Sequence, residues 1–152
     1  MKGEVPKGNV PKAPARQLET TQCCDAFSAN GGNDPMPFSN GTEIDAVTLD
    51  LPAGNYVLNA KVLVGDRSSA GGGEVLCTLR RGQTGNIVPD TSAVRLFGGA
   101  PPNAGSTAML PLTGTVTLTV QKTVRLHCVT TSSDAFAQWA QLNAVEVGTI
   151  RP

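Results

Sequence analysis

The stretch IDAVTLDLPAGNYVLNAKVLV, residues 44–64, decides the fold, because apolar and polar residues alternate along it on both sides of a turn. Successive side chains of a strand project to opposite faces, so this alternation predicts two half-buried β-strands. Between them, Pro52 fixes φ and Gly54 permits a positive φ, which favours a tight turn and hence a β-hairpin. The residues expected to face inward are Val47, Leu49, Leu51, Tyr56, Leu58, Ala60, Val62 and Val64.

Short runs of the same kind recur along the chain, separated by many of its 17 glycines and 11 prolines. No segment favours a helix, and the pattern predicts an all-β, antiparallel jelly-roll sandwich over residues 20–152. Residues 30–35 and 65–73 have the composition of loops. The further strands are expected over 20–29, 75–80, 91–97, 106–112, 115–120, 124–128 and 135–150.

Length and charge limit the classes of protein to consider. A chain of 152 residues suits one domain with its own core, and a formal net charge of zero argues against a general nucleic-acid binder. No apolar run approaches the roughly 18 residues that span a membrane. The chain begins Met-Lys-Gly-Glu without an apolar segment, so we expect no secretory signal.

Residues 1–19 form a separate, proline-rich segment in which Val-Pro-Lys occurs twice. Prolines at this density prevent a helix and favour an extended arm. Four positive side chains against Glu4 make residues 1–16 positively charged, with a net +3. The segment is either a disordered tail or an arm that lies against an acidic surface or a second copy of the chain. The residues expected to make that attachment are Lys2, Val5, Lys7, Val10, Lys12 and Arg16.

Residues able to carry catalysis are few. His127 is the only histidine, and strand alternation places it on the outer face while Cys128 faces inward, so the two make a poor nucleophile–base pair. The carboxylates are scattered, the glycines at 71–73 lack the lysine of a phosphate-binding loop, and the loop at 30–34 matches no calcium motif. We therefore expect no enzyme activity, no cofactor and no metal.

The four cysteines leave their chemistry open. Cys77 and Cys128 occupy inward positions of two strands, where they form a core disulfide or pack as small apolar groups. The adjacent Cys23 and Cys24 either bridge to other subunits or remain thiols. No CxxC spacing occurs, which argues against zinc.

The last segment, 135–150, carries apolar residues on both of its faces, which is typical of a strand covered on both sides. Covering the second face of this strand requires another sheet or another subunit, so this segment predicts an oligomer. We expect Trp139 and Tyr56 to be buried, which leaves neither for stacking on a sugar. The candidates for the subunit interface are Trp139, Leu142, Val145 and Val147.

Two short motifs, Asp25-Ala-Phe-Ser-Ala29 and Leu51-Pro-Ala-Gly-Asn-Tyr56, resemble the jelly rolls of complement globular heads and tumour necrosis factors. The later pieces, VLCTL at 75–79, VRLHC at 124–128 and LNAVEVG at 142–148, resemble a bacterial version found in actinobacterial surface proteins and in bacteriophages. The resemblance covers roughly residues 20–150. It implies a homotrimer packed about a threefold axis.

Two functions are compatible with these features. The first is a bacteriophage virion protein, a trimeric decoration or fibre that assembles in the host cytoplasm and is anchored by its arm to a capsid or tail protein. Its partners would be other virion proteins, with a host-surface ligand as a further candidate. The alternative is a bacterial cell-surface adhesin that binds glycan or protein. That alternative predicts an export signal and exposed aromatic residues, so the first is favoured.

Overall fold

The computed structural model describes residues 24–68, 72–83, 86–97 and 105–148. For residues 86–90 it describes the backbone alone. The described part of the chain contains no helix, and therefore none with the length and apolar composition needed to cross a bilayer. Its strands are β1 (Ala26–Asn30), β2 (Met36–Phe38), β3 (Glu43–Leu51), β4 (Gly54–Asp66), β5 (Gly73–Arg81), β6 (Asn86–Leu96), β7 (Thr107–Leu118), β8 (Lys122–Thr130) and β9 (Ala135–Val147).

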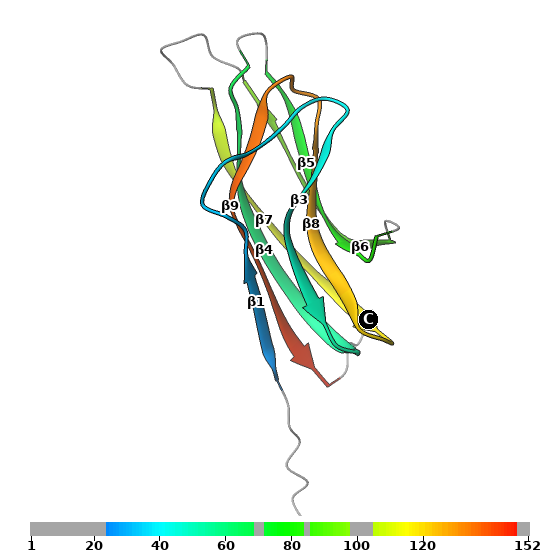
Figure 1. Ribbon diagram of the computed structural model, residues 1–152. Coiled ribbons are helices and arrows are strands. Elements are labelled where there is room, and N and C mark those ends of the chain that lie inside the picture. Colours follow the sequence, from blue (N-terminus) through cyan, green and yellow to red (C-terminus); the bar gives the residue numbers. More distant parts are fainter. Residues whose placement is uncertain (1–23, 69–71, 84–85, 98–104, 149–152) are drawn as a thin grey trace, which may run out of the picture.

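The strands form two antiparallel sheets packed face to face (Figure 1). One sheet has the order β1-β9-β4-β7, with β2 also paired to β9, and the other has the order β3-β8-β5-β6. The all-β, antiparallel jelly-roll sandwich predicted from the alternation is confirmed.

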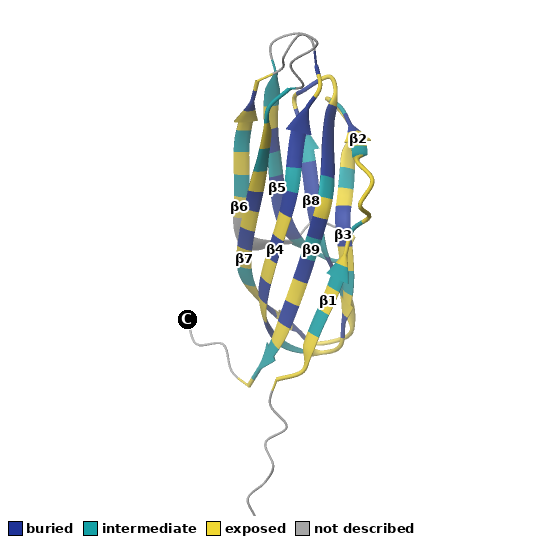
Figure 2. Cartoon of the chain, turned by 90° about the vertical axis from the view of Figure 1, so that its left-hand side faces the viewer, coloured by how far each residue is buried: buried dark blue, intermediate teal, exposed yellow. Residues whose placement is uncertain are grey.

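The core lies between the sheets and is almost wholly aliphatic. Buried and exposed residues alternate along the strands, which Figure 2 shows as bands on β4 and β9. Tyr56 is the only large aromatic side chain of the core without exposed surface. The other large side chains with less than 2% exposure are aliphatic apart from one carboxylate, and they are Leu51, Leu58, Leu79, Leu112, Leu126, Leu142, Val62, Val64, Val75, Val124 and Asp66.

The predicted hairpin at residues 44–64 is wrong in its pairing. β3 pairs with β8, whereas β4 pairs with β7 and β9, so the turn after Leu51 carries the chain from one sheet to the other. Alternation identifies the buried face of a strand but not the strand that it pairs with. The faces of β3 and β4 that were predicted to be buried do point into the core. Gly54 does not have a positive φ. A Cβ there would lie 2.9 Å from both Tyr56 Oη and Glu146 Oε1, so close packing requires the glycine.

Several boundaries also differ from the sequence-based expectation; β6, for example, begins at Asn86 and not at residue 91. The strands predicted at 106–112 and 115–120 are one continuous strand, β7, which ends before the exposed Val120. Pro111 is accommodated because β7 is an edge strand, where a missing N–H interrupts no ladder on the open side. The first strand begins at Ala26, and residues 20–23 of its predicted range lie outside the described residues.

Tyr56 leads to a prediction about alkaline pH. Its Oη donates a hydrogen bond to the Pro52 carbonyl (3.1 Å), and burial, followed by the charges of Glu146 and Asp25, raises its pKa above the ordinary value of 10.0. Between the two pKa values the unfolded chain has lost the phenol proton while the folded chain keeps it. Stability should therefore fall as the pH rises above 10.0.

The chain has one tyrosine, so its phenolate absorbance follows Tyr56 alone. We expect a titration midpoint above 10.0 in the folded protein, and a smaller alkaline loss of stability in Tyr56→Phe. A folded protein that titrates at the ordinary value would contradict the prediction.

Candidate functional site

The outer faces of the two sheets differ sharply in charge. We call the outer surface of β4 from Asn55 to Lys61, of β7 from Thr113 to Thr117 and of β9 from Asn143 to Val147 the neutral face. Its cross-strand neighbours include Val57 opposite Val145 and Asn59 opposite Asn143. Lys61 is the only ionisable residue among its members, which are Asn55, Val57, Asn59, Lys61, Thr113, Thr115, Thr117, Asn143, Val145 and Val147.

The neutral face is also partly apolar. The side chains of Val57 and Val145 lie side by side on adjacent strands and are 37% and 38% exposed. Around them the amide and hydroxyl groups are paired in part with each other, as where Thr117 Oγ1 donates to Asn55 Oδ1 (2.8 Å). A surface of this composition can be covered without desolvating a charge other than that of Lys61.

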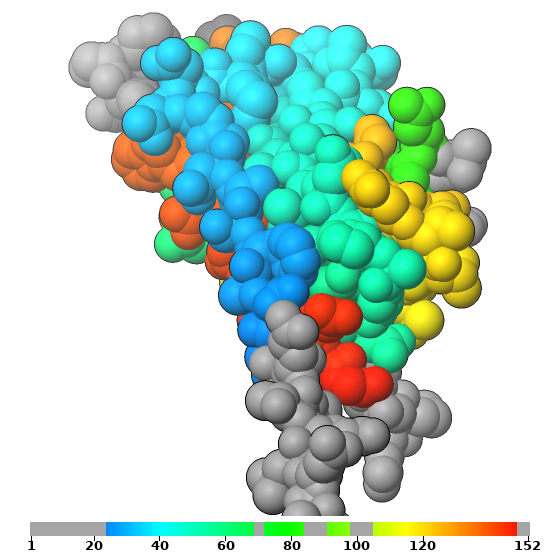
Figure 3. Space-filling model, turned by 60° about the horizontal axis from the view of Figure 1, so that its bottom comes forward, coloured from blue at the N-terminus to red at the C-terminus, as the bar shows by residue number. Residues whose placement is uncertain are grey.

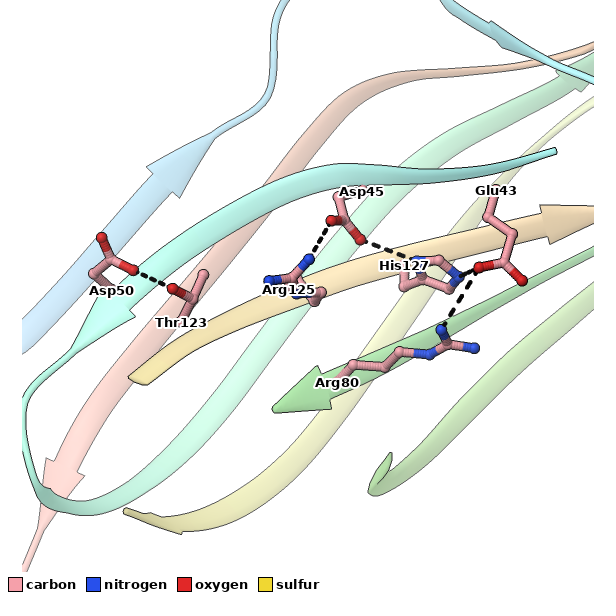
Figure 4. Close-up of polar contacts among 7 residues, drawn as sticks. All are labelled: Glu43, Asp45, Asp50, Arg80, Thr123, Arg125 and His127. Atoms are coloured by element: carbon pink, nitrogen blue, oxygen red, sulfur yellow. Dashed lines mark hydrogen bonds and ion pairs between the residues drawn. The ribbon is translucent and has the colours of Figure 1, made fainter. Parts of the chain in front are cut away.

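The outer face of the β3-β8-β5 sheet carries the opposite kind of surface, a cluster of paired charges (Figure 4). Asp45 accepts a hydrogen bond from Arg125 Nη1 (2.5 Å), and its other oxygen lies 3.0 Å from His127 Nδ1. Glu43 Oε2 lies 3.1 Å from His127 Nε2 and 4.0 Å from Arg80 Nη1. Within this cluster each carboxylate lies beside an arginine or His127, so the cluster presents less unpaired charge than its composition suggests.

His127 is enclosed by the side chains of this cluster. It lies on the outer face as predicted, but the neighbouring side chains leave it only 7% exposed. The reason is strand register, because Asp45 of β3 lies directly opposite His127 of β8. The sequence contains both residues but no local signal that they meet.

Cys77 and Cys128 lie directly opposite each other on β5 and β8, and a disulfide joins them. Both are completely buried between the sheets, on the side away from His127. Cys128 is therefore not available as a thiolate beside that histidine. Among the described residues, no three His, Cys, Asp or Glu side chains come together in a way that could hold a metal ion.

The structure separates the four candidates for the subunit interface. Leu142 is fully buried in the chain's own core, so its assignment to an interface is wrong. Val145 and Val147 lie on the neutral face. Trp139, which was expected to be buried, is 51% exposed.

A β-bulge in β9 explains these differences. Lys61 of β4 faces Gln141 and Leu63 faces Gln138, so β9 has one extra residue at this point. The inward positions change from Ala135 and Ala137 before the bulge to Ala140 and Leu142 after it. The apolar residues at both odd and even positions of 135–150 are thus explained in part by the bulge, which exchanges the inward and outward positions. They do not mean that both faces are covered along the whole strand.

The attachment residues Lys2, Val5, Lys7, Val10, Lys12 and Arg16 lie outside the described residues. The chain enters β1 at the end of the sandwich where β9 ends, as Figure 3 shows from below. The loop from β1 to β2 lies farther up the sandwich (Figure 1).

No family model and no curated protein matches the sequence. The fold does match solved structures. Eiger TNF from S. frugiperda aligns with a TM-score of 0.59 and 9% identity, over 86% of this chain and 97% of that one. A chain of infectious bursal disease virus, Gx strain, aligns with a TM-score of 0.55 and 18% identity, over 85% of this chain and 33% of that one.

A chain of T=1 particles derived from infectious bursal virus aligns similarly, with a TM-score of 0.56 and 12% identity, over 95% of this chain and 36% of that one. The chain thus spans about a third of the viral chains it matches. At these identities the likeness establishes a jelly roll shared with a TNF and with virus-particle proteins, and nothing finer.

Proposed function

We propose that this chain is a structural protein of a bacteriophage particle, displayed as a homotrimer of jelly rolls and anchored by its N-terminal arm to a capsid or tail protein. The observation that carries the proposal is the contrast between the two outer faces. The outer face of one sheet carries paired charges around Asp45 and His127, whereas the outer face of the other carries a neutral face centred on Val57 and Val145.

A subunit contact on the neutral face is favoured by its low desolvation cost. Charged residues are depleted from the centres of protein interfaces, because each unpaired charge removed from water costs several kcal/mol. Only Lys61 carries a charge here, and its long side chain can extend to a rim. Three copies arranged about a threefold axis would close the contact into a ring.

The remaining support comes from the fold and from the disulfide. The same fold occurs in proteins of infectious bursal disease virus particles. Disulfides such as Cys77–Cys128 persist on virion and cell surfaces and are rare in the cytosol, so the pair fits a chain that ends outside the cell. The arm would leave the sandwich at one end, and the β1–β2 loop would remain available for display.

Assembly is tested by native mass spectrometry of the full chain and of three variants. We expect a trimer for the wild type and monomers for Val57→Asp and Val145→Asp, because each would bury a carboxylate without a partner. Thr48→Asp adds the same charge on the other sheet and should remain trimeric. Circular dichroism should be unchanged in all three. A monomeric wild type, or trimeric Val57→Asp and Val145→Asp, would contradict this interface.

The location is tested by mass spectrometry of purified phage particles, in which the chain should appear in copy numbers divisible by three. One observation favours the alternative of a bacterial cell-surface adhesin. The Trp139 ring is exposed, and an adhesin could stack a sugar on it. Recovery of the chain from bacterial envelopes and not from particles would decide for that alternative.

A further inference from the structure

A hollow of about 510 Å³ lies where the β1–β2 loop passes over the bulge in β9. This volume falls within the range of roughly 300–1,000 Å³ that is common for small-molecule sites. The residues that line it are Asn30, Gly31, Gly32, Asn33, Trp139, Ala140 and Gln141.

Trp139, which lines the hollow, has an unfavourable backbone conformation. Its φ of 52° lies in the left-handed region, which a bulky side chain rarely adopts and which glycine would accept without cost. Bulge positions with this conformation are commonly glycine. The chain instead keeps a large aromatic ring that is 51% exposed, so about half of the ring's surface is left without any gain from burial. Such outliers are concentrated at functional sites.

The walls of the hollow are already in place. Gly31 N–H donates to the Ala140 carbonyl (2.7 Å), and Gln138 Nε2 donates to the Asn33 carbonyl (2.5 Å), so the loop is tied to β9 on both sides of Trp139. The β1–β2 loop also lies close to the backbone of β3, because a Cβ at Gly31 would lie 2.5 Å from the carbonyl oxygen of Ala46. A ligand would therefore meet a formed surface and would not have to order it.

The chemistry of the lining points to one class of ligand. None of the lining residues is ionisable, so a phosphate or a carboxylate would find no side-chain countercharge there. The amides of Asn30, Asn33 and Gln141 each offer both a donor and an acceptor, which matches hydroxyl groups that are themselves donor and acceptor. The indole offers an apolar ring with a polar edge. We propose that this hollow binds a neutral saccharide, with one sugar face on Trp139 and its hydroxyls on the amides.

This site goes beyond the proposed structural role and does not depend on it. A sugar site beside the β1–β2 loop would serve a virion protein or a surface protein equally. It also assigns Trp139 to ligand binding and not to the contact between subunits.

The test uses the fluorescence of the full chain, in which Trp139 is the only tryptophan. Glucose, galactose, mannose, rhamnose and N-acetylglucosamine, and short oligosaccharides of each, are titrated one at a time. We expect a saturable change of emission with at least one of them. Titration calorimetry with that sugar should then show a loss of affinity of about tenfold or more in Trp139→Gly.

Trp139→Gly should at the same time keep or raise the melting temperature, because it removes the ring together with the unfavourable φ. Gly32→Phe provides a second variant, since a Cβ at Gly32 meets nothing closer than 3.9 Å and its ring can occupy the hollow. It should also lose binding. Phe97→Ala removes another exposed aromatic ring, at the end of β6, and should bind as the wild type does.

Three results would overturn the proposal: no saturable change with any neutral sugar, binding of charged sugars or mononucleotides only, or dissociation of the trimer in Trp139→Gly. The last would place the ring in the subunit contact. The first two results do not bear on whether the chain is found in phage particles or whether Val57→Asp dissociates the trimer. The third arises only if the wild type is a trimer, and it adds Trp139 to the subunit contact without bearing on the location in particles, so the two proposals fail separately.

Discussion

Deleting residues 1–16 is expected to leave a folded, trimeric jelly roll that no longer joins its assembly. The segment has too few apolar residues to form a core, and ordering it costs about 1 kcal/mol per residue in backbone entropy. A partner surface has to offset that cost, and the net +3 charge of the segment suits an acidic one. The measurement is the fraction of truncated protein that sediments with particles lacking the wild-type chain.

A matched variant separates charge from mere length. Changing Lys2, Lys7, Lys12 and Arg16 to Gln keeps the segment and its prolines, and attachment should weaken without the chain being shortened. Raising the salt concentration should weaken attachment of the wild type as well, because exposed charge pairs are screened. If the truncated chain sediments with particles as fully as the wild type, the attachment surface lies on the jelly roll.

Replacing Cys77 and Cys128 together by Ala should lower the free energy of unfolding by about 3–5 kcal/mol. The disulfide joins residues 51 apart in sequence, so it removes much of the conformational freedom of the unfolded chain. The two small side chains also lie in the core, where the lost sulfur atoms leave unfilled space. Equilibrium denaturation with and without reductant measures the change.

The double variant retains Cys23 and Cys24, so any response to reductant that it still shows comes from those two cysteines and is subtracted from the response of the wild type. When the wild type is reduced under denaturing conditions, its free energy of unfolding should fall toward that of the double variant. Equal stability of the oxidised wild type and the double variant would mean that the crosslink adds nothing to the native state.

Much of the architecture was predictable from residues close together in sequence. The alternation at 44–64 identified the buried residues of β3 and β4, from Val47 to Val64, because a side chain's face depends only on its position along its own strand. The same local rule predicted that Cys77 and Cys128 face inward and that His127 faces outward.

What remained undetermined depends on which strands become neighbours. The hairpin expected around Pro52 became a crossing between sheets, and Asp45 met His127, because pairing is set by contacts distant in sequence. The hollow shows this most clearly. The apolar residues on both faces of 135–150 predicted that Trp139 is buried, but β9 has one extra residue against the register of β4. This residue reverses the parity of the strand and turns the ring outward beside the β1–β2 loop. A period of two is a property of the strand, whereas a bulge is a property of the pair.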